Sequence, residues 1–253
     1  MRSLSPEPCL DVLVARADLK GTCVMLYDAV VLMQYRTRDL LLRQQTQVIN
    51  ALRAHLAELG IVAAQGREGL KQLLAIIADE KDARLPIDAR ASLIVLAAQL
   101  QAVHTMIGSI ERRLTVQHRA NEASKRLQSI HGIGIIGASA IAATVTDPKA
   151  FRSGRDFAAW IGLVPRQDST GGKPKLGPIS KQGDRYLRRI LVVGAHSVLR
   201  RAKQNPQKYP WLAQLLARRP FKVVAVALAN KMARIAWALL ASGGHYRPRL
   251  AAA

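Results

Sequence analysis

Two hydroxyl side chains followed by two glycines form the stretch of this chain that is best suited to covalent chemistry. Ser169 and Thr170 directly precede Gly171 and Gly172, inside a polar loop that runs from Pro165 to Gly183. Glycines let a backbone approach a ligand closely, and exposed amides beside basic side chains favour an anion. The basic residues of the loop are Arg166, Lys173, Lys175 and Lys181. A serine in this setting is either a phosphate ligand or a nucleophile, and the alternative interpretation is a solvated surface loop.

The segments on both sides of the loop have to position it. An apolar stretch precedes it from Ala158 to Val164, and a second stretch follows it from Asp184 to Ala195. The apolar residues of the second stretch are spaced as in a helix that buries one face. Its basic start holds Arg185, Arg188 and Arg189. Beside the loop lysines, these arginines favour nucleic-acid contact over the alternative of a solvated helix face.

The formal net charge of +21 is concentrated in the second half of the sequence. Residues 1–120 contribute +3 and residues 121–253 contribute +18. This excess predicts a polyanionic partner, and nucleic acid is the one that we favour. A membrane surface and a merely solubilising face are the alternatives. Beyond the loop, the basic stretch continues through Arg200, Arg201, Lys203, Lys208, Arg218, Arg219 and Lys222.

Residues 127–144 are predicted to fold as a helix, a tight turn and a second helix. The turn is His131-Gly132-Ile133-Gly134, and isoleucines on both sides supply apolar packing. The pattern resembles a helix-hairpin-helix, in which turn amides hold a phosphate without reading bases. Gly132 and Gly134 are therefore predicted to contact a nucleic-acid backbone. The alternative is a packed corner between two helices.

A long helical hairpin is predicted before this turn. Residues 26–59 show helical spacing that stops at Gly60, residues 70–77 form a short apolar helix, and Pro86 marks a break. From residue 89 to 127 a heptad seam recurs at steps of three and four: Leu93, Leu96, Leu100, Val103, Ile107, Ile110 and Leu114. We expect an antiparallel coiled-coil hairpin. Its seam closes either within one chain or between two copies, and the second alternative would make a homo-oligomer.

The overall composition favours helices. Aromatic residues make up only 4% of the chain and hydrophobic residues 49%, so the core must consist largely of leucine, isoleucine, valine and alanine. The expected fold is mainly α. It comprises an irregular segment at 1–26, a coiled-coil helical region at 27–126, a small helical serine domain at 127–245 and a tail at 246–253.

The cysteines and the apolar segments bear on compartment and membrane. Cys9 and Cys23 have no histidine pair nearby, which predicts neither a zinc site nor a disulfide framework. A reducing cytoplasm is therefore the expected compartment. The most apolar late stretch, 223–240, contains Lys231 and Arg234, so we expect a buried helix and no membrane partner.

Four segments of the chain together resemble one family of bacterial insertion-sequence transposases. Its members combine an N-terminal nuclease-like domain, which carries a DEDD tetrad of acidic residues, with a C-terminal serine domain. They are relatives of the pilin-gene invertases and include recombinases guided by a bridge RNA. The order and spacing of the segments carry the resemblance: Arg36 to Ile61, Leu127 to Ala143, Phe151 to Ala195 and Asn230 to Leu240.

The resemblance implies a role in DNA transposition or site-specific recombination. It places the serine nucleophile at Ser169, with DNA as the partner and a guide RNA as a further candidate partner. The family's DEDD residues bind a divalent metal, so Mg²⁺ is the cofactor expected for the full-length family.

The acidic tetrad itself is not found in this sequence. Asp11, Asp18 and Asp28 lie in a short region without the strand pattern of a nuclease-like domain, and the acids from Asp79 to Asp88 lie between helices. The expectation is a chain that is truncated at its N-terminus and holds no metal or cofactor. Whether such a chain is an enzyme by itself stays open.

Two other functions compete with transposition. One is a non-catalytic nucleic-acid-binding helical protein, in which Ser169 only contacts a phosphate. The other is a helix-hairpin-helix repair enzyme such as a glycosylase, which requires a catalytic Lys or Asp after the hairpin in a base pocket. Asp147 is the nearby candidate, and it stands beside a proline.

Overall fold

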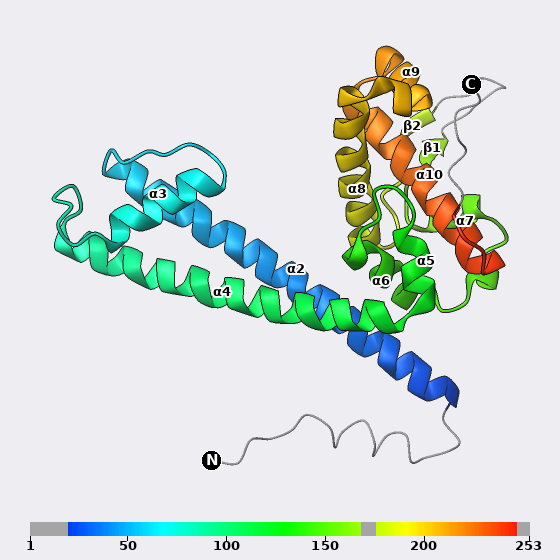
Figure 1. Ribbon diagram of the computed structural model, residues 1–253, viewed down its shortest axis with the longest axis horizontal. Helices are drawn as coiled ribbons and strands as arrows, with labels where there is room; N and C mark the ends of the chain where they lie inside the picture. Colours follow the sequence, from blue (N-terminus) through cyan, green and yellow to red (C-terminus); the bar gives the residue numbers. More distant parts are fainter. Residues whose placement is uncertain (1–19, 168–175, 247–253) are drawn as a thin grey trace. The chain divides into compact units, whose positions relative to one another are not determined.

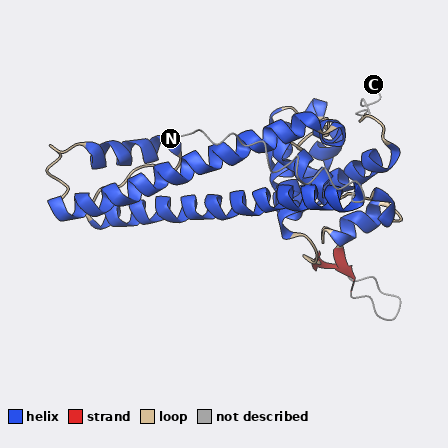
Figure 2. Cartoon of the chain, turned by 90° about the horizontal axis from the view of Figure 1, so that it is seen from below, coloured by secondary structure: helices blue, strands red, loops and turns tan. Residues whose placement is uncertain are grey.

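The computed structural model describes residues 20–167 and 176–246. The predicted class, mainly α, is confirmed, because the described residues form helices apart from one small pair of strands (Figure 2). The chain divides into two compact units. One comprises residues 33–113, and the other comprises residues 1–32 together with 114–253.

The unit of residues 33–113 is built from two long helices and a short one. Helix α2 spans Lys20–Glu58, α3 spans Arg67–Ala78 and α4 spans Ile87–Ala120 (Figure 1). Helices α2 and α4 run antiparallel, because Arg38 Nη2 donates to Glu111 Oε1 at 2.5 Å and Gln45 Nε2 lies 2.6 Å from His104 Nε2. The helices predicted in these three places are confirmed.

The heptad seam of α4 is packed within this chain. Leu93 and Leu100 are buried in one apolar cluster with Leu52 of α2. Val103 is buried in a second cluster with Leu41, also from α2. These buried residues of the seam thus pack against α2 of the same chain, and pairing of two copies stays a prediction.

Arg90 joins the end of α3 to the start of α4 from a buried position. Its guanidinium donates hydrogen bonds to the carbonyl oxygens of Ile76 and Ile77, both at 3.1 Å, and to that of Asp82 at 2.6 Å. It also donates to the carbonyl oxygen of Asp79. The last carbonyls of a helix have no partner inside it, so Arg90 supplies donors that α3 lacks.

We expect Arg90→Met to lower the free energy of unfolding of this unit by about 3 kcal/mol, because several carbonyl oxygens lose their donor at once. Urea unfolding followed by circular dichroism measures the change. Arg113→Met, at an exposed position of the same helix, is the matched control and is expected to change stability by no more than about 0.5 kcal/mol. Equal effects of the two variants would contradict the role given to Arg90.

The spacing of apolar residues predicts one helix from residue 89 to 127, and this prediction is wrong at Asn121. Helix α4 ends one residue before it, and α5 (Glu122–Gln128) begins one residue after it. Asn121 has extended backbone angles, and its side chain accepts a hydrogen bond from the Ser124 amide as the N-cap of α5. The buried His118 of α4 also links the two helices, because its Nδ1 lies 2.7 Å from Oγ of Ser124 in α5.

The second unit is organised around its last helix, α10 (Phe221–Ser242), which packs against α5, α7, α8 and α9. Val224, Leu228, Met232 and Ala236 form its buried face. The other elements are α6 (Ile135–Thr144), η1 (Pro148–Ala150), α7 (Gly154–Trp160), β1 (Pro165–Gln167), β2 (Leu176–Ile179), α8 (Arg185–Gln204), η2 (Pro206–Lys208) and α9 (Pro210–Arg218).

Two helices in the described part of the chain, α4 and α10, are long and apolar enough to cross a membrane by length and composition alone. Core helices pass the same test. Helix α10 keeps Lys231 and Arg234 exposed while its apolar face is buried in the unit, so the predicted buried helix is confirmed.

The turn between α5 and α6 and helix α8 approach each other through two glycines. A Cβ atom added to Gly194 would lie 2.0 Å from the carbonyl oxygen of Gly132. Gly132 itself has φ 92°, and a Cβ there would lie 2.9 Å from the Gly194 carbonyl oxygen. Backbone meets backbone at this crossing, so neither position has room for a side chain.

Phe151, Phe157 and Trp160 pack together. Their ring centroids lie 5.2, 5.5 and 6.0 Å apart, and Phe157 is fully buried. Trp237 of α10 fixes η1, which precedes α7 in the chain, because its Nε1 donates to the Pro148 carbonyl oxygen at 2.9 Å. This aromatic cluster supports α7, from which the serine loop departs.

Candidate nucleic-acid interface

The serine loop is closed at its base by the antiparallel pair β1 and β2, in which Pro165 stands opposite Ile179. The segment between the strands, 168–175, lies outside the described residues and holds Ser169, Thr170, Lys173 and Lys175. The strand pairing therefore brings together the two ends of the segment that carries the predicted nucleophile.

Glycines and one arginine hold the base of the loop against α7. A Cβ atom added to Gly183 would lie 1.7 Å from the last carbonyl oxygen of α7, and one added to Gly162 would lie 2.1 Å from the Gln182 carbonyl oxygen. Arg188 of α8 closes the same region, because its Nη1 donates to the carbonyl oxygens of Ile161 at 2.7 Å and Gln182 at 2.8 Å.

The structure places the predicted basic residues of this region in two settings. Arg188 is half-buried and bound to backbone carbonyls, so its contacts here are structural. Arg166, Lys181, Arg185 and Arg189 are exposed around the base of the loop. Arg166 Nη2 approaches the Ser180 carbonyl oxygen at 3.5 Å, and Arg189 lies 5.4 Å from the Tyr186 ring centroid. Contact of any of them with nucleic acid stays a prediction.

Gly132 and Gly134 line a separate cavity of about 370 Å³ at the turn between α5 and α6. The Ile133 amide donates to the Ile130 carbonyl oxygen at 2.9 Å, and the positive φ of Gly132 suits the third position of a type II turn. Helix α8 completes the cavity wall with Ser197 and Arg201. The fold thus brings the two predicted glycines together with a basic side chain from sixty-odd residues later in the chain.

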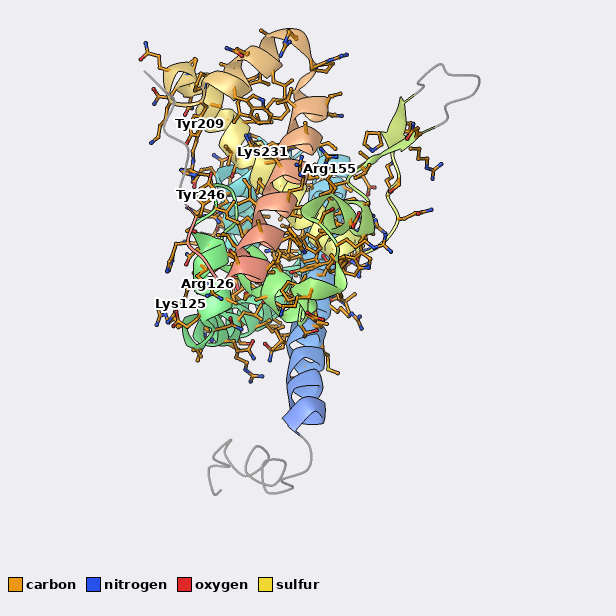
Figure 3. The ribbon with its side chains drawn as sticks, turned by 90° about the vertical axis from the view of Figure 1, so that its right-hand side faces the viewer. Lys125, Arg126, Arg155, Tyr209, Lys231 and Tyr246 are labelled. Atoms are coloured by element: carbon orange, nitrogen blue, oxygen red, sulfur yellow. The ribbon has the colours of Figure 1, made fainter. Side chains whose placement is uncertain are left out.

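Aromatic rings flank this cavity, and the sequence pattern gave no sign of them. The His131 ring lines the cavity, and its centroid lies 6.3 Å from that of Tyr209 and 6.2 Å from that of Tyr246. Figure 3 shows Tyr209 and Tyr246 on the same side of the unit. Neither tyrosine belongs to a periodic pattern, and Tyr246 falls in the segment that was expected to be a tail.

Two further aromatic rings of the second unit each have a lysine ammonium group above the ring. Lys231 Nζ lies 4.1 Å from the Trp211 ring centroid, and Lys203 Nζ lies 5.1 Å from that of Phe221. Trp211 is 42% exposed although it is a large apolar residue. Cations over aromatic faces are favourable, and this pairing keeps the exposed rings within a basic surface.

Three of the described carboxylates of the second unit, Asp147, Asp184 and Glu122, serve as caps or as an ion-pair partner. Asp147 and Asp184 accept hydrogen bonds from backbone amides at helix starts. Lys125 Nζ binds Glu122 at 2.7 Å and lowers the pKa of that carboxyl. Among the described residues no group of three or more His, Cys, Asp and Glu could hold a metal ion. These residues therefore do not fit the divalent metal that the family resemblance implies.

The chain is similar to named transposases over most of its length. The "Probable family 20 transposase" of Pseudomonas aeruginosa is 45% identical over 216 residues, which are 85% of this chain and 64% of that protein. The transposase for insertion sequence element IS1328 of Yersinia enterocolitica is 40% identical over 83% of this chain and 62% of that protein. The transposase for IS1111A of Coxiella burnetii is 38% identical over 84% of this chain and 58% of that protein.

All three relatives are named as transposases, and two of them are transposases of insertion-sequence elements. Residues 124–210 match the model of the transposase IS116/IS110/IS902 family, and this stretch includes the sequence of the serine loop and the residues that line the cavity. The chain spans about three fifths of the length of the relatives just named, between 58% and 64%.

Proposed function

We propose that this chain is a DNA transposase or site-specific recombinase of an insertion sequence, with Ser169 as its nucleophile. The observation that carries the proposal is the family match at 124–210, which covers the serine loop in the half of the chain that holds a net charge of +18. A guide RNA and a second copy of the chain stay proposed partners. Mg²⁺ stays the cofactor proposed for complete relatives.

In the proposed step, Ser169 Oγ attacks a phosphorus atom of the DNA backbone. An Oγ–P bond forms and the P–O3′ bond breaks; the proton leaves Oγ, and the leaving O3′ takes up a proton. DNA is then joined to the protein as a 5′-phosphoserine, which conserves the bond energy for rejoining to another 3′-hydroxyl. Arg166 and Lys181, exposed at the base of the loop, are suited to neutralise the charge on the phosphoryl oxygens.

A non-catalytic nucleic-acid-binding protein is the second candidate, and the carboxylates favour it. Three acids in the described part of the second unit, Asp147, Asp184 and Glu122, are already used as caps or as an ion-pair partner. Under this alternative Ser169 contacts a phosphate and breaks no bond. The two functions therefore differ in one product, a covalent adduct between serine and DNA, which Ser169→Ala must abolish under the first function.

DNA binding itself is expected to weaken steeply with salt, because it rests on neutralised phosphates. Arg185→Gln is expected to reduce the slope of log K against log salt by about 0.9, the value for one lost phosphate contact. Fluorescence anisotropy with a labelled duplex measures the slope. Lys71→Gln removes the same charge from an exposed position of the other unit, and we expect it to leave the slope unchanged. Equal slopes for both variants and the parent chain would contradict binding at the base of the loop.

A further inference from the structure

The cavity at the turn between α5 and α6 has the chemistry of a site for one unpaired nucleotide. We propose that a single-stranded polynucleotide binds here, with a phosphate at Arg201 and the turn amides and with a base against Tyr209 and Tyr246. This inference rests on the proposed function, because it specifies which form of nucleic acid the second unit holds.

The phosphate half of the site rests on donors that the fold leaves available. Arg201 is exposed, lines the cavity and has no carboxylate partner within the described residues. In the same part of the chain, the amides of His131, Gly132 and Gly134 donate to no backbone carbonyl, whereas the Ile133 amide closes the turn. Backbone amides and a guanidinium that line the same cavity are suited to a phosphate oxygen.

The base half of the site rests on the way the rings are oriented. The His131 ring meets Tyr209 at an interplanar angle of 83° and Tyr246 at 72°, so the rings touch edge to face and are not stacked on one another. His131 is exposed and both tyrosines are half-buried. Both tyrosines thus stand beside His131, which lines the cavity, and we infer that a base stacks on their partly exposed rings.

The combination selects single strands over duplex. In a duplex the faces of each base are covered by its neighbours, so a base can stack on a tyrosine only where it is unpaired and splayed out. A duplex offers this site phosphates alone. A cavity of about 370 Å³ lies within the usual range for small-ligand sites, which suits a nucleotide unit.

Basic residues continue the site on both sides along the unit. Lys125 and Arg126 lie in α5, just before the turn, and Lys208 of η2 directly precedes Tyr209. Arg126 Nη1 donates to the Gly243 carbonyl oxygen at 2.9 Å, which anchors the segment that leads to Tyr246. In Figure 3, Tyr209, Tyr246, Arg126 and Lys125 lie along one side of the unit, and the β1–β2 hairpin projects on the other. The site is therefore separate from the serine loop.

The test compares the full chain with Tyr246→Leu, Tyr209→Leu and Arg201→Gln in fluorescence anisotropy. The probes are oligothymidylate, oligouridylate and a mixed-sequence duplex, all of equal length. We expect each tyrosine-to-leucine change to weaken binding of the single strands about tenfold, as for the loss of one base-stacking contact, and to leave the duplex nearly unaffected. Tyr246→Phe keeps the ring and is the matched control, with binding unchanged.

The outcomes separate this inference from the proposed function. Tighter binding of oligouridylate than of oligothymidylate would identify RNA as the source of the strand, and the reverse order would identify DNA; both support the site. Tyrosine variants that bind single strands as well as the parent chain overturn the inference, as does an equal loss for single strand and duplex. If the duplex still binds with a steep salt dependence in that case, the proposed function stands. If the parent chain binds none of the three probes, both this inference and the proposed function are overturned.

Discussion

Gly194→Ala is expected to lower the free energy of unfolding of the second unit by about 3 kcal/mol, although it adds only one methyl group to a helix. The new Cβ would lie 2.0 Å from the Gly132 carbonyl oxygen and 3.3 Å from Met232 Cε. The first obstacle is backbone, which no rotamer change can move away. The turn between α5 and α6 must therefore separate from α8, and we expect binding at the Arg201 cavity to weaken with it.

Gly108→Ala is the matched control for this substitution. Gly108 also lies inside a helix, and a Cβ added there meets no atom within 4 Å. Alanine is the better helix former, so this variant is expected to be more stable than the parent chain by up to about 1 kcal/mol. Urea unfolding of both variants, followed by circular dichroism, measures the contrast. A stabilising effect of Gly194→Ala would contradict the close crossing of the turn and α8.

The helices of this protein could be predicted because a helix that buries one face carries apolar residues at a regular spacing in the sequence. The seam from Leu93 to Leu114 identifies α4 and its packing face, and the structure buries that seam against α2. The break at Asn121 was missed because the apolar seam ends at Leu114, so the spacing gives no sign of where the helix stops. Its cause is a capping hydrogen bond to the Ser124 amide, which asparagine makes without any change in the apolar period.

The site was predictable only in part, because long-range contacts decide which residues meet. Gly132 and Gly134 were predicted from the turn, whereas Arg201, Tyr209 and Tyr246 join them through the packing of α8 and the chain end. The sequence also gave no sign that the Arg188 guanidinium binds the carbonyl oxygens of Ile161 and Gln182, and its contact with phosphate stays a prediction. The sequence alone does not show whether a basic residue at the start of a helix binds backbone carbonyl oxygens or a phosphate.

The serine loop lies at the centre of the proposed chemistry, and a covalent trapping experiment tests it most directly. The purified chain is mixed with internally labelled supercoiled DNA or end-labelled branched DNA and Mg²⁺, denatured, and run on a gel to detect protein-linked DNA. Ser169→Ala and Ser180→Ala are run beside it. Ser180 is the matched control, because it lies in the same loop, just past β2, and its amide binds the Val164 carbonyl oxygen at 2.9 Å.

We predict a serine-linked adduct for the parent chain and for Ser180→Ala, and complete loss of that adduct for Ser169→Ala with DNA binding retained, because only the Ser169 hydroxyl forms the bond to phosphorus. An adduct that persists in Ser169→Ala would contradict Ser169 as the nucleophile. Absence of an adduct in every variant, alongside tight and salt-sensitive DNA binding, would contradict catalysis by this chain and favour the non-catalytic function.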